Sequence, residues 1–349
     1  MIDVLRALPR RSVRLFRSRL VDRGVILLYH RIAERQFDPW GLNVDPSLFE
    51  EQMETLSRHG QPLPLGEAVR SLHERRTPDR FIAVTFDDGY ADNLAVAKPI
   101  LARLGIPATL FVPTTYVSSG KELWWDLLQR LLLEPSTLPP VVELRIAGEA
   151  HRWALGDAAR YDEETALRYR DWIVDMPPPT LRHFLCTILY ALLKPLPYAE
   201  QHEVLAALAA QRGTESPDLV RHPVLTADEV RRFAEPGVYD VGAHSATHPV
   251  LSGLSAGEQR REIRGSRVRL EEMVGGPVTM FAYPYGGSTS YTAETKRAVV
   301  DARYEAAFIN RDGAIENGSD RFELPRFQVK NWDAREFSRH LRKWLRGVS

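Results

Sequence analysis

Cysteine is nearly absent from this sequence, with Cys186 the single example among 349 residues. One thiol excludes an intrachain disulfide and a metal site built from several thiolates. Cys186 lies in the apolar run His183–Leu193, so we interpret it as a buried structural thiol. Low cysteine content is typical of a reducing compartment but does not establish one.

The chain also lacks a charge excess and a long hydrophobic run. Lys and Arg number 46, as do Asp and Glu, whereas nucleic-acid-binding domains usually carry a strong basic excess. No stretch of about 18 apolar residues occurs, so we expect no transmembrane helix. The 44% hydrophobic content is that of an ordinary globular protein, which at this length needs neither disulfide nor metal to fold.

The N-terminal segment, residues 1–23, lacks the continuous apolar core of a signal peptide, because arginines interrupt each apolar run. Its apolar residues beyond Pro9 can share one helical stripe opposite several arginines. This pattern suits a helix that lies on an anionic membrane surface. It also suits a helix that packs against the domain with its arginines in water, which we favour. We therefore expect a cytoplasmic protein, with peripheral contact to the inner membrane face as the alternative.

Short buried strands alternate with helices along much of the chain. This order predicts a parallel sheet with crossover helices. A leucine-rich, mostly helical stretch interrupts the pattern, and we interpret it as an insertion rather than a separately folding domain. The expected strands cover residues 24–29, 81–86, 108–112, 238–241, 278–282 and 306–309. The expected helices cover residues 46–58, 226–234, 255–274, 292–302 and 334–346, with another that ends at Gly105.

Two polar clusters directly follow predicted strands. Asp87 and Asp88 are adjacent carboxylates that repel each other and are costly to desolvate, which a cation would relieve. The alternative is a solvated turn in which one Asp caps a helix. His244 and His248 are four residues apart and can direct both imidazoles at one ion. With Asp88 they would form a ligand set that leaves a position open for water, as catalytic metal sites do.

A third cluster, Phe281–Gly287, contains proline and paired glycines. It predicts a tight turn whose backbone N–H groups face a pocket, although a plain aromatic turn has the same sequence pattern.

In combination, Thr-Phe-Asp-Asp-Gly, His-Ser-Ala-Thr-His and Tyr-Pro-Tyr-Gly occur in an order that resembles the polysaccharide deacetylase family, carbohydrate esterase family 4 with the NodB homology domain. The resemblance covers residues 24–112 and 225–346. It implies an α/β fold, a distorted (β/α)7 barrel with a divalent metal at the carboxyl ends of its strands. We therefore expect a barrel formed by residues 24–116 and 225–349, with a mostly helical insertion at 117–224.

The resemblance also implies roles for individual residues at matching positions. Asp87 would be the general base, and Asp88, His244 and His248 the metal ligands. The backbone N–H of Tyr285 would stabilise the oxyanion.

The sequence departs from the family pattern at two positions. Ala282 stands where the family carries an arginine that orients the base, and Arg326 is our candidate substitute. The late Leu-x-His motif that supplies the general acid is absent, since His340 looks like a surface residue of an amphipathic helix. His30 resembles the histidine of the permuted, exopolysaccharide N-deacetylase-like branch, which precedes the Asp-Asp motif. First and last strands are neighbours in a closed barrel, so His30 can occupy the same place in space; a structural histidine is the alternative.

These expectations describe a metal-dependent hydrolase that removes N-acetyl groups from amino sugars of a surface polysaccharide or its biosynthetic precursor. We expect zinc, although iron, cobalt and nickel also suit two imidazoles and a carboxylate. The expected partner is a carbohydrate, not nucleic acid, and Tyr90, Tyr283 and Trp332 are candidates either for stacking on sugars or for the core. The alternatives are a deformylase of a lipid-linked sugar, a cyclic-amide hydrolase, or a non-catalytic carbohydrate-binding module.

Overall fold

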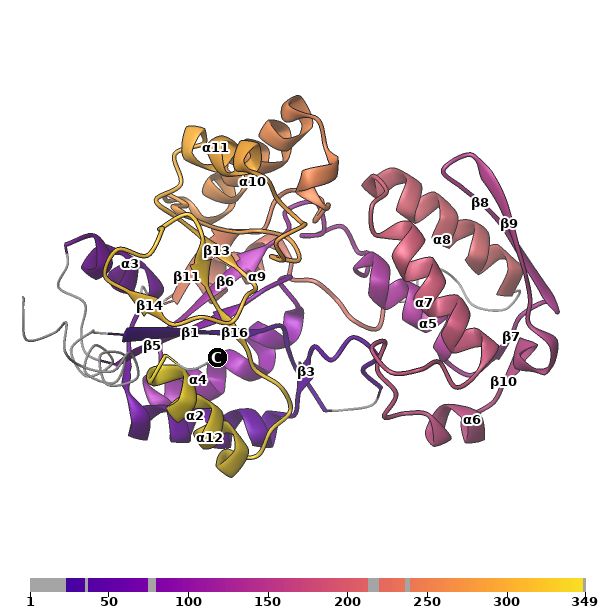
Figure 1. The fold of residues 1–349 in the computed structure, drawn as a ribbon, viewed down its shortest axis with the longest axis horizontal. Coiled ribbons are helices and arrows are strands. Elements are labelled where there is room, and N and C mark those ends of the chain that lie inside the picture. The colour runs from indigo at the N-terminus through magenta and orange to yellow at the C-terminus, as the bar shows by residue number, and fades with distance from the viewer. Residues whose placement is uncertain (1–22, 35–36, 75–79, 213–219, 236–238, 348–349) are drawn as a thin grey trace, which may run out of the picture.

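The computed structural model describes residues 23–34, 37–74, 80–212, 220–235 and 239–347. The chain forms two lobes, one around a strongly bent sheet and a smaller one made by the insertion (Figure 1). The prediction of an amphipathic segment at 1–23 falls, through residue 22, outside the described residues. Among the helices of the described ranges, none is both long enough and apolar enough to cross a membrane.

The larger lobe is built on one sheet that is nearly closed into a barrel. All neighbouring strands on its main path pair in parallel, except for the antiparallel pair at the first edge. In spatial order these strands are β14 (Ile315–Glu316), β1 (Arg23–Tyr29), β5 (Phe81–Phe86), β6 (Ala108–Val112), β11 (Tyr239–Ala243), β12 (Met280–Ala282), β13 (Ala306–Ile309) and β15 (Leu324–Pro325).

The barrel closes at Arg326. The strand before this residue, β15, pairs with β13, and the strand after it, β16 (Phe327–Gln328), pairs in parallel with β1. Because one residue separates the two pairings, the first and last strands of the barrel are neighbours. The predicted barrel architecture is thereby confirmed, and Arg326 lies at its seam.

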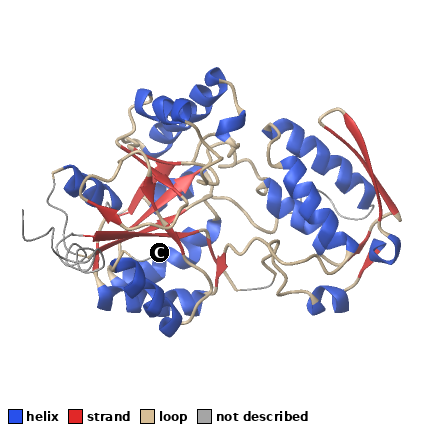
Figure 2. Cartoon of the chain, viewed as in Figure 1, coloured by secondary structure: helices blue, strands red, loops and turns tan. Residues whose placement is uncertain are grey.

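Helices surround the sheet on its outer side (Figure 2). β5 and β6 are buried at every position, as expected for parallel strands covered on both faces. The helices of this lobe are α2 (Pro46–His59), α3 (Leu65–His73), the π-helix η2 (Asn93–Ala97), α4 (Lys98–Leu104), α9 (Ala227–Phe233), the 3-10 helix η4 (Leu251–Gly253), α10 (Ala256–Val274), α11 (Ala293–Asp301) and α12 (Ala334–Leu345). Its remaining short strands are β2 (Arg31–Ile32), β3 (Asn43–Val44) and β4 (Gln61–Pro62).

The smaller lobe is mostly helical, as predicted, but it also contains a hairpin that the sequence analysis missed. In the hairpin strand Val141–Ile146, buried and exposed positions alternate, so one face packs on the lobe. Cys186 is buried in the hydrophobic cluster of this lobe, where burial raises the pKa of its thiol. The elements are α5 (Trp124–Leu133), β7 (Ser136–Thr137), β8 (Val141–Ile146), β9 (Glu149–Ala154), the 3-10 helix η3 (Gly156–Ala159), β10 (Arg160–Tyr161), α6 (Glu163–Arg168), α7 (Leu181–Leu193) and α8 (Tyr198–Arg212).

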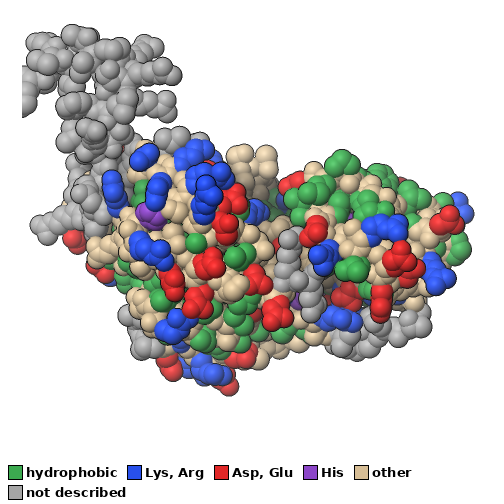
Figure 3. Space-filling model, turned by 90° about the horizontal axis from the view of Figure 1, so that it is seen from below, with side chains coloured by type: hydrophobic (Ala, Val, Ile, Leu, Met, Phe, Trp, Pro, Cys, Tyr) green, Lys and Arg blue, Asp and Glu red, His purple; other side chains and the backbone are tan. Residues whose placement is uncertain are grey.

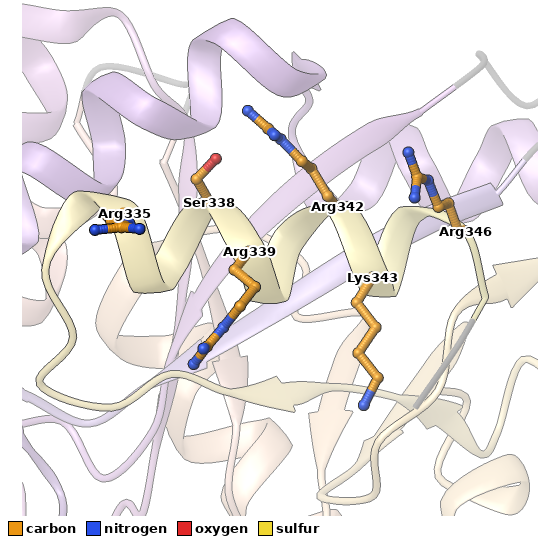
Figure 4. A pocket seen from close by; sticks show the side chains of 6 residues that line it. All are labelled: Arg335, Ser338, Arg339, Arg342, Lys343 and Arg346. Carbon is orange, nitrogen blue, oxygen red and sulfur yellow. The ribbon is translucent and has the colours of Figure 1, made fainter.

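The closing helix α12 is strongly amphipathic. Phe337, Leu341 and Trp344 are buried against the barrel, while basic side chains cover its outer face (Figure 4). Figure 3 views the molecule from below the view of Figure 1 and shows Lys and Arg side chains gathered on part of the larger lobe. A shallow depression on the helix contains none of the predicted site residues; it is lined by Arg335, Ser338, Arg339, Arg342, Lys343 and Arg346.

Candidate active site

A cavity of about 230 Å³ lies at the carboxyl ends of the barrel strands. All predicted catalytic and metal-ligating residues except Arg326 line this cavity. They lie in the loops that follow β1, β5, β11 and β12. The predicted residues that line the cavity are His30, Asp87, Asp88, His244, His248 and Tyr285.

Asp88, His244 and His248 surround one point. The Nε2 atoms of His244 and His248 lie 3.6 and 3.4 Å from Oδ1 of Asp88, and one ligand atom from each residue lies within 4.8 Å of the others. Ligand atoms about 2.0–2.2 Å from a tetrahedral metal are roughly 3.3–3.6 Å apart. Both separations fall within this range, so the three side chains form a possible metal site.

The electrostatics of these groups also fit a bound cation. Burial, together with the charge of Asp87, raises the pKa of Asp88 well above its ordinary value, and Oδ1 of Asp88 is a buried atom without a hydrogen-bond partner in the described structure. Burial lowers the pKa of both His244 and His248, which leaves their imidazoles neutral. A cation bound here would be coordinated by the unpartnered oxygen of Asp88 and by the lone pairs of the two neutral imidazoles.

A backbone carbonyl orients the imidazole of His244, and a glutamate holds the loop that carries both histidines. Nδ1 of His244 donates to the carbonyl of Ala282 at 2.7 Å, which leaves its Nε2 lone pair facing the cavity. The loop from 244 to 248 is held by Glu262 of α10, whose carboxylate accepts hydrogen bonds from the backbone of Ala246 and Thr247. Glu262 is a supporting residue that the motif did not reveal, because it lies on a distant helix.

Asp87 is fixed by the residue at the barrel seam. Arg326 is fully buried and donates to both carboxylate oxygens of Asp87, at 2.7 and 2.6 Å. Burial by itself would raise the pKa of Asp87, but the charge of Arg326 and its hydrogen bonds leave this pKa below the ordinary value. Asp87 therefore stays ionised although it is buried. Ala282, at the position where the family pattern has an arginine, is buried in β12, and the arginine that contacts Asp87 is Arg326.

The turn after β12 carries Tyr285, which lines the same cavity. Tyr285 and Gly286 have φ angles of 62° and 61°, in the left-handed region. A Cβ at Gly286 would lie 2.3 Å from the backbone N of Asn310, so only glycine fits there. In the described part of the chain, the N–H of Tyr285 donates to no other residue. Asp88 and His248 also adopt positive φ angles of 72° and 59°, a concentration of strained backbone that is typical of functional sites.

His30 follows β1 directly, beside β16. The backbone N–H of Asp87 donates to the carbonyl of Tyr29 at 3.0 Å, which ties the Asp-Asp turn to the residue before His30. Burial lowers the pKa of His30 to about 3, against an opposing effect of the Asp87 charge. The imidazole thus lines the cavity in its neutral form.

The insertion lobe supplies a cavity wall that the motifs did not predict. Trp125, Val174, Tyr190 and Lys194 line the cavity together with Trp40. The Trp125 ring lies 4.9 Å from that of His248, and Trp40 stacks on Tyr190 at 4.8 Å. The Trp124-Trp125 pair was visible in the sequence, but its position beside the site depends on how the lobe folds back.

The aromatic residues suggested for sugar stacking lie elsewhere. Tyr90 and Tyr283 are both 1% exposed and belong to the core. Trp332 stacks on His340 of α12 at 4.2 Å. None of the three is among the residues that line the cavity, so the core alternative holds for Tyr90 and Tyr283.

The fold is a nearly closed α/β barrel with a possible His/Asp metal site and, beside it, a second carboxylate held by arginine. The sequence profile of the polysaccharide deacetylase family matches residues 74–138 and 197–307. The chain belongs to the polysaccharide deacetylase family. Asp87, Asp88, His244, His248 and Tyr285 lie within the matched residues, whereas His30 and Arg326 lie outside them.

Individual relatives agree with this assignment. YxkH of Bacillus subtilis, which its name places among polysaccharide deacetylases, is 37% identical over 89 residues; the alignment covers 25% of this chain and 30% of that protein. The chain thus aligns with less than a third of its relative's length. Among solved structures, the Streptococcus pyogenes deacetylase PplD in complex with acetate is 17% identical, with a TM-score of 0.57 and coverage of 91% of this chain and 98% of that one. IcaB from Ammonifex degensii gives a TM-score of 0.57 and 17% identity over 93% and 98% of the two chains. These likenesses show the shared fold.

Proposed function

We propose that this protein is a metal-dependent N-deacetylase that acts on amino sugars of a surface polysaccharide or its biosynthetic precursor. One observation carries the proposal. Asp88, His244 and His248 converge around one point, and a separate, ionised carboxylate, Asp87, lies beside them with its oxygen 3.7 Å from Nε2 of His244. Three ligands and an unligated base are the parts needed to hydrolyse an amide with activated water.

We further propose that Asp88, His244 and His248 hold the metal. A divalent ion bound there would supply a more acidic water and polarise the acetamide carbonyl. The donor set suits zinc, and also iron, cobalt or nickel. The orphaned Oδ1 atom of Asp88 supports this assignment, because a buried carboxylate oxygen without a partner is costly.

Asp87 is the proposed general base. Its ionised form is maintained by the two hydrogen bonds from Arg326, so it is ready to accept the proton of the attacking water. Arg326 donates one hydrogen bond to each carboxylate oxygen of Asp87 and thereby fixes the plane of the carboxylate. In this role Arg326 is a positioning residue.

The backbone N–H of Tyr285 is the proposed donor to the oxyanion. The positive φ angles at Tyr285 and Gly286 hold this N–H without an acceptor in the described structure. A single donor of this kind is worth roughly 3–4 kcal/mol in the transition state.

His30 is the proposed proton donor to the departing amine, which leaves poorly as an anion. Because burial lowers the pKa of His30 to about 3, the resting imidazole is neutral. His30 therefore has to gain its proton during turnover, and Asp87, whose charge acts on His30, is the group that has just received one from water.

We also propose that residues 24–116 and 225–349 form the barrel domain and that residues 117–224 are an insertion that walls the substrate cavity. Its separate hydrophobic cluster and its cavity residues, Trp125 and Tyr190 among them, support this division.

The decisive experiment is acetate release from N-acetylglucosamine oligomers by the metal-loaded protein, with D87N as the control. Acetate release by the wild type alone supports the proposal. Formate release from N-formyl sugars, or opening of cyclic amides, with no acetate from N-acetyl sugars would overturn it in favour of another amidase. Metal binding without any hydrolysis would indicate a carbohydrate-binding module.

A further inference from the structure

One cation faces the substrate cavity from the insertion lobe. Lys194 follows the last residue of α7 and lines the cavity. Its Nζ atom lies 4.2 Å from the ring centroid of Tyr285, and the ring of Tyr285 lies 4.7 Å from that of His248. A single aromatic ring therefore separates this ammonium group from the candidate metal site.

Among the described residues, the charge of Lys194 has no acidic partner. In the described part of the chain, no hydrogen bond or ion pair joins its ammonium group to another residue, and burial alone lowers its pKa, with no carboxylate acting against it. Lys330, which also lies near the site, is different. Its Nζ donates to the carbonyl of Gly41 at 3.0 Å. Burial lowers the pKa of Lys330, and the charges of Asp38 and Asp175 oppose this shift.

The surroundings explain how the side chain of Lys194 is held but not what its donors bind. A helix C-terminus and an aromatic face each stabilise a cation, and Lys194 has both. An ammonium group nevertheless has three donors, and a half-buried charge is costly without a counter-charge. The carboxylates that line the cavity are Asp87 and Asp88, which the catalytic site already uses.

We propose that Lys194 binds an anionic group of the substrate, a phosphate or a carboxylate, carried by the amino sugar whose acetamide reaches the metal site. This inference rests on the proposed deacetylase function and narrows its substrate class. The ammonium group and the metal ligand His248 lie on either side of one aromatic ring. This spacing suits an acidic group that is attached to the same sugar ring as the acetamide, directly or through one atom. A lysine is a compact point charge, which suits either anion.

The test compares three probes with the metal-loaded protein: N-acetylglucosamine 1-phosphate, N-acetylglucosaminuronic acid and the neutral methyl glycoside of N-acetylglucosamine. We expect kcat/KM for at least one acidic probe to exceed that for the neutral probe by about tenfold or more, as a partly shielded charge pair provides. The preferred probe identifies the anion as phosphate or carboxylate. Lys194→Met should abolish the preference mainly through KM, and Lys194→Arg should retain part of it.

Two controls make the result interpretable. Lys121→Met removes a cation that lies 5.7 Å from the ring of Tyr198, outside the cavity, and should leave the preference intact. Calorimetric binding of glucosamine 1-phosphate and glucosaminuronic acid to the metal-free wild type and Lys194→Met gives a readout independent of turnover, and the variant should bind the preferred anion about tenfold more weakly.

Acetate release without any acidic preference in the wild type overturns this inference and leaves the proposed function standing, whether or not Lys194→Met folds. Equal losses on acidic and neutral probes in a folded Lys194→Met also overturn it. No acetate from any probe or from N-acetylglucosamine oligomers overturns the proposed function itself.

Discussion

Arg326 and Asp87 are joined by two hydrogen bonds of 2.7 and 2.6 Å across 239 positions of sequence. The pairing is possible because Arg326 occupies the single position between β15 and β16, where the barrel closes. A planar guanidinium group matches both oxygens of a carboxylate, and a lysine cannot. The site therefore depends on the closure of the fold as well as on the motifs around it.

Arg326→Lys tests this dependence. The variant keeps the charge but loses the paired bonds, so we expect kcat/KM to fall by about 10- to 100-fold, the cost of misplacing a catalytic group. The pKa of Asp87 should rise, because the hydrogen bonds from Arg326 help to lower it, and the acidic limb of the pH–rate profile should move to higher pH. Arg339→Lys, on the exposed face of α12, is the matched control. An unmoved acidic limb would show that Arg326 does not set the ionisation of the base.

The sequence was sufficient for the barrel and for the residues in its motifs. Asp87 and Asp88 directly follow β5, and His244 directly follows β11. These residues lie close together because the carboxyl ends of parallel strands meet at one edge of the sheet. The arginine was harder to locate, since its position depends on a two-residue strand on either side, too short to give a periodic pattern. Lys194 and Glu262 were not predictable, because they reach the site through packing of distant helices.

Asp87→Asn and Asp88→Asn should separate the base from the metal ligand. Asp87→Asn should retain nearly all bound metal and lose turnover, because it removes the proton acceptor and none of the three ligands. Asp88→Asn should lose most of its metal, since it removes the only carboxylate ligand. Elemental analysis after dialysis against zinc, followed by an acetate-release assay, measures both effects. Equal metal loss in the two variants would mean that the two roles are misassigned.

His30→Ala tests the proton donor. We expect the rate on amides to fall by at least about 100-fold, the usual scale of general acid catalysis. The loss should be much smaller on an acetyl ester, because an alkoxide leaves more readily than an amide anion. Steady-state rates on paired amide and ester substrates give the comparison. If both substrates respond equally, His30 has a structural role, which is the alternative reading of its position.

Gly286→Ala tests the backbone donor. A methyl group there meets the backbone N of Asn310 at 2.3 Å, at a φ angle of 61°, so the turn that presents the N–H of Tyr285 must shift. We expect kcat to fall by about 100-fold or more, as when one oxyanion donor is removed, with metal content unchanged. Gly253→Ala is the control, because a methyl group at that glycine meets nothing within 4 Å. Normal kcat in Gly286→Ala would exclude the turn from catalysis.

Asp126 connects the insertion to the stability of the protein. Its carboxylate is 1% exposed and accepts a hydrogen bond from the hydroxyl of Tyr90 at 2.7 Å. Burial raises its pKa to about 7, although the charge of Arg31 opposes the shift, whereas the pKa in the unfolded chain is about 3.9. The folded state therefore holds this proton more firmly than the unfolded state. The resulting stabilisation is fully present below about pH 4 and is lost as the pH rises through about 7.

Asp126→Asn removes this titration and keeps an acceptor for Tyr90. Relative to the wild type, the variant should gain about 2–3 kcal/mol in the free energy of unfolding between pH 5 and pH 8, at about 1.4 kcal/mol for each pH unit over which only one state is protonated. Urea unfolding with a chelator present, which removes the contribution of metal binding, measures the difference at both pH values. Asp157→Asn, an exposed position in the same lobe, should show no such change. A pH-independent difference between wild type and Asp126→Asn would mean that the buried carboxyl is already ionised at pH 5, and that Arg31 compensates its charge more fully than its burial indicates.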